Sequence, residues 1–188
     1  MLHASIRRQV IADAPSRAPA IDTLRLLGTD GYAHAPRPPR HSHSSTPVHS
    51  TPATLYLAHA GIWAIDMTTG AKRMVAPIDN KLLVADVEGL AIAPEGKDGG
   101  YLVASSQGDN AYAVFRLPDM TPVGRFRIAK GAFGSVEETD GIELDNRDFG
   151  PDFPKGLFIA QDGVNAPKAQ NFKYVRWDEV LAALEAGR

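Results

Sequence analysis

An internal repeat constrains the fold of this chain more than any other feature. The block DVEGLAIAPEGKDGGYLVASSQGDNAYAVF, from Asp86 to Phe115, recurs between Thr139 and Val175. In both copies a carboxylate and a glycine open an apolar strand, a second strand begins with glycine, and a Gln/Asp/Gly/Asn loop follows. Repeats of roughly 40–50 residues that contain several short strands are typical of propeller blades. The sequence therefore predicts an all-β fold built from blades of a β-propeller.

Short strands separated by turns are predicted from Thr54 onward. The most complete set has strands at 87–93, 101–105, 111–117 and 124–128. A meander at 55–58, 62–66 and 72–75 precedes it, and strands at 141–144, 157–160 and 172–175 follow it. Apolar residues at helical spacing within residues 177–185 predict a short C-terminal helix.

Residues 1–53 differ in composition from residues 54–188, and a boundary is predicted between the two. The first part holds half of the 14 prolines and five of the six histidines, and the run from Ala35 to Pro52 is of low complexity. Such a segment buries too little apolar area to offset the entropy lost on ordering. We therefore expect residues 1–53 to be disordered, with at most one or two short helical turns ahead of that run.

The overall composition argues against several classes of protein. The chain is 44% hydrophobic and 22% charged, its net charge is -2, and it lacks the stretch of about 20 apolar residues that a membrane helix needs. Neither a membrane nor a nucleic acid is an expected partner. Without cysteine, a disulfide framework, a thiolate zinc site and a cysteine phosphatase are all excluded. Arg7 and Arg8 interrupt the apolar core that an export signal would need, so the localisation stays open.

Two acidic residues and one amide stand out next to the predicted strands. Asp86 and Glu88 are two residues apart, so along a strand they would face the same side. Their oxygens suit a hard cation such as calcium, and Gln107 could add a neutral carbonyl ligand. Spacing alone favours the alternative, in which Asp86 and Glu88 are solvated acids at a strand end and Gln107 is an ordinary turn residue, and it leaves both interpretations open.

Several strings, taken together, identify a family. DVEGLAI, YLVASSQGDNAYAVF, FRI, ETDGIEL, GLFIAQDGVN and QNFKYVRWDEV resemble, in order and spacing, the C-terminal part of the β-propeller phytases, which are calcium-dependent enzymes. The resemblance covers most of residues 55–184 and implies a six-bladed propeller about twice as long as this chain. It therefore implies the last two blades plus part of a third, whereas residues 1–53 match nothing in the family.

The resemblance also implies a calcium site at the mouth of the central channel. Its ligands would be Asp86 and Glu88 of the DVEG step, Gln107 of SSQGDN and Asp140 of the TDGI step. The repeat places Asp140 on the next blade at the position of Glu88.

A second, structural calcium site is implied at Asp162 and Asn165 of QDGVN. The family often has carboxylates at the positions of Val164 and Gly134, and losing two anionic ligands should weaken this site. Another departure is at His59, because the family has a pair of acids after that strand and imidazole is a softer ligand than calcium prefers.

The activity implied is that of a phosphoric monoester hydrolase, a 3-phytase. It would release phosphate from phytate by calcium-assisted attack of water. No histidine follows His59 that could serve as a nucleophile. The alternative is a non-catalytic propeller fragment that binds calcium or a partner, because the residues that grip phosphates in the family come from earlier blades. A separate N-terminal propeller half could then complete the ring.

Overall fold

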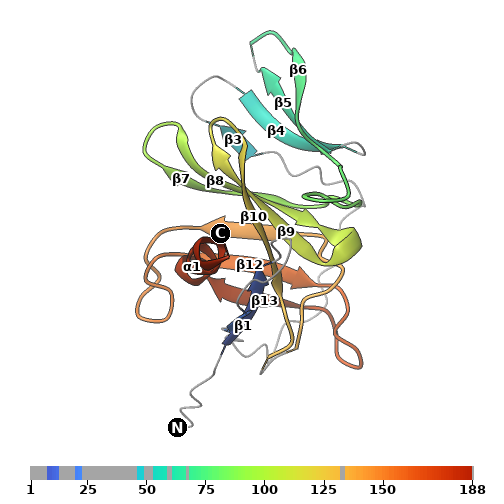
Figure 1. Cartoon of the computed structure of the whole chain (residues 1–188), viewed down its shortest axis with the longest axis vertical. Coiled ribbons are helices and arrows are strands. Elements are labelled where there is room, and N and C mark those ends of the chain that lie inside the picture. Colours follow the sequence, from blue (N-terminus) through green and yellow to red (C-terminus); the bar gives the residue numbers. More distant parts are fainter. Residues whose placement is uncertain are drawn as a thin grey trace.

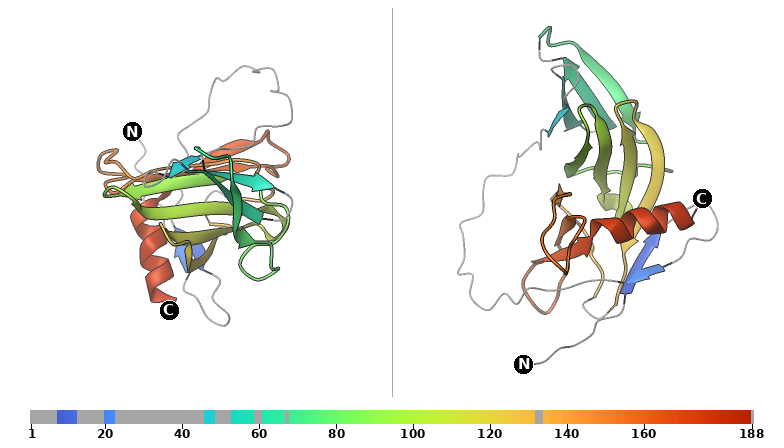
Figure 2. Two further views of the ribbon diagram at one scale, coloured as in Figure 1. Left: turned by 90° about the horizontal axis from the view of Figure 1, so that it is seen from above. Right: turned by 90° about the vertical axis from the view of Figure 1, so that its left-hand side faces the viewer.

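Three antiparallel sheets make up the fold in the computed structural model (Figure 1). The residues described are 8–12, 20–22, 46–48, 53–58, 61–66, 68–131 and 134–187. The first sheet has the strand order β3-β4-β5-β6, the second β2-β1-β10-β9-β8-β7 and the third β11-β12-β13. The sheets follow one another in the manner of propeller blades, and over the described residues they do not close into a ring (Figure 2).

The bounds of the elements agree closely with the repeat. The first sheet contains β3 (Thr46–Val48), β4 (Ala53–Ala58), β5 (Gly61–Asp66) and β6 (Lys72–Pro77). The second is formed by β7 (Leu90–Glu95), β8 (Gly99–Ser106), β9 (Ala111–Leu117) and β10 (Thr121–Ile128), extended at its edge by β1 (Arg8–Ala12) and β2 (Ala20–Asp22). The third contains β11 (Ile142–Asp145), β12 (Leu157–Asp162) and β13 (Asn171–Arg176). A 3₁₀ turn, η1 (Gln107–Asp109), follows β8, and α1 (Trp177–Ala186) ends the described chain.

The two copies of the repeat have the same strand register. In the second sheet Leu90 pairs with Ala104, and in the third Ile142 pairs with Ala160. The first pair joins the start of β7 to β8, and the second joins the start of β11 to β12. The strands β7 and β11 lie side by side. Glu88 and Asp140 therefore occupy equivalent positions, each two residues before its strand begins.

Alternation along the central strands produces two hydrophobic cores. On β8, Val103 faces the third sheet while Leu102 and Ala104 face the first. On β9, Tyr112 and Val114 share the core of Val103, whereas Ala113, Phe115 and Leu117 belong to the other. Because successive side chains of a strand point to opposite faces, a sheet covered on both sides has apolar residues at nearly every position. The second sheet is accordingly the middle layer of the molecule.

The helix α1 covers one end of the core between the second and third sheets. Trp177, Val180 and Leu184 are buried there, and the Trp177 ring meets Tyr101 edge-on at 5.7 Å between centroids. An aromatic group of Tyr112, Phe126 and Phe158 fills the centre of the same core, with centroids 5.0 to 5.3 Å apart. Among the described residues, no helix has both the length and the apolar character needed to span a membrane.

Two sequence expectations differ from the structure. The strand predicted from residue 87 begins at Leu90, because the amide groups of Glu88 and Gly89 donate to the side-chain hydroxyl of Ser105 on β8 instead of to a backbone carbonyl. Within residues 1–53, expected to be disordered or briefly helical, the structure contains the strands β1, β2 and β3. The strand β1 pairs with β10 from Val10 opposite Ile128 to Ala12 opposite Phe126. The remainder of that stretch lies outside the described residues.

Candidate metal-binding site

The segment that carries Asp86 lies directly against the turn that carries Gln107. The amide nitrogen of Gln107 donates a 2.8 Å hydrogen bond to the carbonyl oxygen of Asp86. Next to it, a Cβ atom on Gly108 would lie 1.5 Å from the carbonyl oxygen of Ala85, so only glycine allows this close approach. These backbone contacts bring Asp86 and Gln107 together, although the two residues are far apart in the sequence.

Ser105 fixes the position of Glu88. Its buried Oγ atom accepts hydrogen bonds from the amide nitrogens of Glu88, at 3.2 Å, and Gly89, at 2.7 Å. Both Asp86 and Glu88 are exposed, and they precede β7, so their common exposure does not come from strand alternation. Ser105 therefore directs the backbone of the DVEG step into β7.

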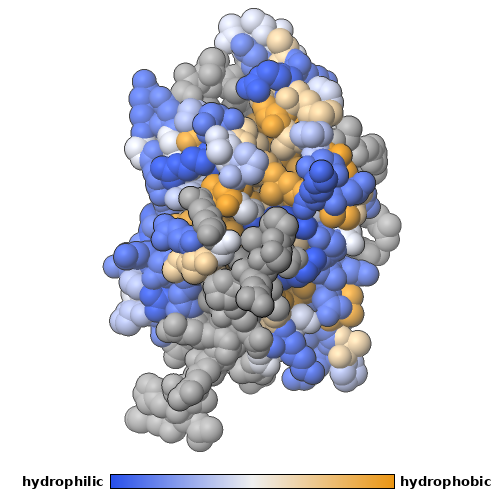
Figure 3. All heavy atoms as spheres, viewed as in Figure 1, coloured by the Kyte–Doolittle hydropathy of each residue, from blue (hydrophilic) through white to orange (hydrophobic). Residues whose placement is uncertain are grey.

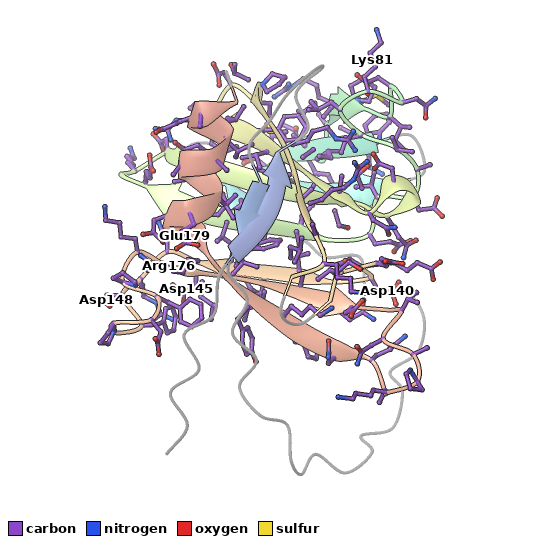
Figure 4. The ribbon with its side chains drawn as sticks, turned by 60° about the horizontal axis from the view of Figure 1, so that its bottom comes forward. Lys81, Asp140, Asp145, Asp148, Arg176 and Glu179 are labelled. Carbon is purple, nitrogen blue, oxygen red and sulfur yellow. The ribbon has the colours of Figure 1, made fainter. Side chains whose placement is uncertain are left out.

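Asp140 joins this group from the neighbouring sheet. The Nε2 atom of Gln107 donates a 2.9 Å hydrogen bond to Oδ1 of Asp140. The Asp140 amide donates in turn to Oε1 of Gln161, at 2.8 Å. Asp140 lies at one end of the β11–β13 sheet, and Asp145 and Arg176 lie at the opposite end (Figure 4).

The donor chemistry of these four side chains suits calcium. Three carboxylates and an amide oxygen are the hard ligands that this ion prefers. Over the described ranges, however, no three acidic or histidine side chains come close enough together to hold a metal ion. The structure thus brings Gln107 to Asp140 and the backbone of Asp86 to Gln107, and it does not bring the three carboxylates onto one point.

Asp162 and Asn165 are in different surroundings. Asp162 is 1% exposed and forms a 2.5 Å ion pair with Nζ of Lys173, while its other oxygen accepts from the amide of Glu137 at 3.1 Å. Asn165 instead closes its own loop, since its Nδ2 donates to the carbonyl of Ala169 at 2.7 Å. Because an ammonium group already neutralises Asp162, a calcium ion bound to Asp162 and Asn165 does not fit the residues present.

Other sequence-selected positions add little to the site. Val164 is 46% exposed, and Gly134 has φ of +82°. Neither has a side chain that can ligate a metal ion. His59 lies outside the described residues, as do the other five histidines.

Sequence reasoning missed three residues that hold the site in place. Gln161 binds the Asp140 amide, Ser105 does the same for Glu88, and Tyr112 forms a 2.7 Å hydrogen bond with Thr139, the neighbour of Asp140. The register shows that Ser105 and Gln161 are equivalent, each following the alanine that pairs with the first strand. An alignment that pairs Gln161 with Gln107, as the repeated loops suggest, is shifted by two residues.

A sequence model of the family described as Phytase matches residues 51–187. The chain belongs to the phytase family. A 3-phytase of Bacillus subtilis (strain 168) is 39% identical over 143 residues, which cover 69% of this chain and 37% of the relative. The chain therefore spans just over a third of the length of this phytase. All four candidate calcium ligands fall inside the part that matches the phytase family.

Proposed function

We propose that this chain carries the calcium-holding, C-terminal part of a phytase site that releases phosphate from phytate. The candidate ligands are Asp86, Glu88, Gln107 and Asp140. Membership of the phytase family supports the substrate class. The observation that carries the assignment of the site is the 2.9 Å hydrogen bond between Gln107 and Asp140, because it joins the equivalent ends of two successive blades.

The charge of the candidate site explains why a cation is needed. Asp86, Glu88 and Asp140 are all exposed, and three carboxylates would repel a phosphorylated ring. Calcium, when bound, would screen that charge, hold a phosphate and activate water for attack on phosphorus. The role of the protein is to hold the oxygen ligands in position. Ser105 and Gln161 fix the backbone at Glu88 and Asp140, and Gln107 fixes the Asp140 carboxylate.

A second function remains a candidate because of the length of the chain. It spans 37% of the 3-phytase that it matches, and the alternative is a calcium-binding or interaction module without turnover of its own. On the face shown in Figure 3, hydrophobic residues gather in the upper half, over the first sheet and the adjoining strands of the second. This distribution is compatible with a separate N-terminal propeller half that covers them.

Phosphate release from phytate by the full chain, measured over a range of calcium concentrations, tests both functions. We expect calcium-dependent release that is abolished in the double variant Asp86→Ala, Glu88→Ala and strongly reduced in Asp140→Asn. Asp145→Asn is a matched control, because Asp145 is a carboxylate at the opposite end of the third sheet and pairs with Arg147. Calcium binding without release at any calcium concentration would favour the binding module, and the absence of both would contradict the proposed site.

A further inference from the structure

A buried ion pair lies beneath the segment that carries Asp140. Lys173 on β13 and Asp162 on β12 are each 1% exposed, and Nζ of Lys173 lies 2.5 Å from Oδ2 of Asp162. The two residues are diagonal neighbours, because Lys173 pairs with Ala160 and Asp162 pairs with Asn171. Lys173 shares the inward side of β13 with Val175, which is also buried.

Both members of this pair also bind the backbone of the segment from Ser135 to Asp140, called the 135–140 segment below. The Lys173 ammonium donates to the carbonyl oxygen of Ser135. Oδ1 of Asp162 accepts from the amide of Glu137 at 3.1 Å, and the carbonyl of Glu137 accepts from the amide of Gly163 at 2.8 Å. The ion pair thus connects two strands of the third sheet to the start of the segment.

The energetics show why these backbone contacts matter. Removing two charges from water costs several kcal/mol per ion, and their mutual attraction offsets that cost only when further hydrogen bonds satisfy them. In this pair the further partners are backbone groups of the 135–140 segment, so the pair is stable only while the segment stays in place. The segment in turn is correctly positioned only while the pair is intact.

We propose that Lys173 is a positioning residue whose ammonium acts as a cation built into the chain. It holds the 135–140 segment against the third sheet, and through that segment it sets the position of Asp140 opposite Gln107. A bound metal ion is not required at this point, because the ammonium already bridges the Asp162 carboxylate and the Ser135 carbonyl. The role of Asp140 as a calcium ligand rests on the proposed function, whereas the position of the 135–140 segment can be measured whether or not calcium binds.

Amide hydrogen exchange of the full chain tests the proposal directly. In Lys173→Met, which keeps most of the length of the side chain and removes its charge, the amides of Val136, Glu137 and Asp140 should exchange at least about tenfold faster than in the wild type. The amides of β8 and β9 should keep their protection. Lys168→Met is the matched control, because Lys168 is an exposed lysine of the nearby loop. Lys173→Arg, which restores the positive charge, should recover part of the protection.

Addition of a calcium chelator to the wild type distinguishes the effect of the Lys173 ammonium from the effect of a bound calcium ion. We expect the chelator to leave exchange at Val136 and Glu137, next to the ion pair, unchanged. If the chelator accelerates exchange as much as Lys173→Met does, a bound cation holds the segment and the proposal is overturned. Unchanged exchange in a folded Lys173→Met variant would overturn it as well.

A measurement on the wild type covers the case in which Lys173→Met does not fold. A buried, hydrogen-bonded ammonium exchanges its protons slowly, so the Nζ group of Lys173 should give a resolved NMR signal near neutral pH, unlike that of Lys168. An Nζ group that exchanges as fast as that of an exposed lysine would contradict the proposal.

Loss of phosphate release in Lys173→Met alone, with amide exchange unchanged, would count against this positioning role and not against the calcium site.

Discussion

The hydroxyl oxygen of Tyr112 lies 2.7 Å from Oγ1 of Thr139, inside the core between the second and third sheets. Thr139 is 4% exposed and is followed directly by the exposed Asp140. The ring of Tyr112 packs against Phe126 and Phe158. One side chain therefore links the aromatic core to the candidate calcium ligand.

Replacing Tyr112 with phenylalanine should lower the free energy of unfolding by about 1–2 kcal/mol, because Thr139 keeps a buried hydroxyl without its partner. Chemical denaturation at neutral pH measures the change. Tyr174→Phe is the matched control, since Tyr174 is only half-buried on β13, and its effect should stay within about 0.5 kcal/mol. Equal effects of the two variants would contradict a stabilising role of the hydrogen bond.

The same tyrosine should make the wild type sensitive to alkali. Burial raises the pKa of Tyr112 well above its ordinary value of 10.0. Its contribution is fully present below the pKa of the unfolded chain, about 10, and is lost as the pH rises toward the folded pKa. The stability difference between the wild type and Tyr112→Phe should therefore shrink above about pH 10. A difference that stays constant up to about pH 11 would argue against burial of the phenol.

Asp109 forms ion pairs with two arginines beside the Gln107 turn. Its Oδ2 accepts from Arg125 at 2.5 Å and from Arg127 at 3.1 Å, and its Oδ1 accepts from Ser106 at 2.8 Å. Burial by itself would raise the pKa of Asp109, but the hydrogen bonds from Arg125 and Ser106 and the charges of both arginines hold it below its usual value. The carboxylate is thus favoured in the folded state.

Asp109→Asn should destabilise the chain by about 1–3 kcal/mol at pH 7, because Arg125 then stays largely buried without its counter-ion. A carboxyl group with a lowered folded pKa stabilises above its unfolded pKa of about 4 and loses that contribution as the pH falls through the folded pKa. The difference from the wild type should accordingly decrease below about pH 4. Denaturation at neutral and acidic pH tests this, with Asp148→Asn at an exposed turn as the control.

Gly108 permits the contact between the two halves of the site. A methyl group there would overlap the carbonyl oxygen of Ala85, so Gly108→Ala should cost about 3 kcal/mol or more and separate Asp86 from Gln107. At Gly141, by contrast, an added Cβ has no atom within 4 Å, and Gly141→Ala should leave stability unchanged or slightly raised. Thermal melting of both variants checks the contrast, and similar melting temperatures would contradict the close packing of Gly108 against Ala85.

The repeat made most of the fold predictable from the sequence. The strands β7 to β13 are predicted within a few residues, because alternating apolar residues and glycine-containing turns are local signals. The equivalence of Glu88 and Asp140 follows from the same pattern and agrees with the strand registers. The start of β7 could not be located in this way, because it depends on a hydrogen bond between Glu88 and Ser105, which are 17 residues apart.

The pairing of Asp162 with Lys173 was also beyond local patterns. Asp162 belongs to the QDGVN motif, which in the family implies a metal ligand. Only the register of β12 with β13 shows that a lysine lies diagonally across from it. The glycine-led strands align Gln161 with Ser105, whereas the loops that follow align it with Gln107, and the registers of the paired strands decide for Ser105. Polar contacts between neighbouring strands can be located only once the register of the paired strands is known.

Gln161 offers the sharpest test of how the backbone supports Asp140. Gln161→Leu keeps much of the side-chain volume and removes the acceptor of the Asp140 amide, which lies 2.8 Å from Oε1 in the wild type. If Asp140 is a calcium ligand, the variant should bind calcium about tenfold more weakly, because the carboxylate is no longer held opposite Gln107. Calorimetric titration of the full chain with calcium measures this. Gln170→Leu, a change at an exposed glutamine that donates to the Gly163 carbonyl at 3.3 Å, should bind as the wild type does, and equal weakening in both variants would refute the role of Gln161.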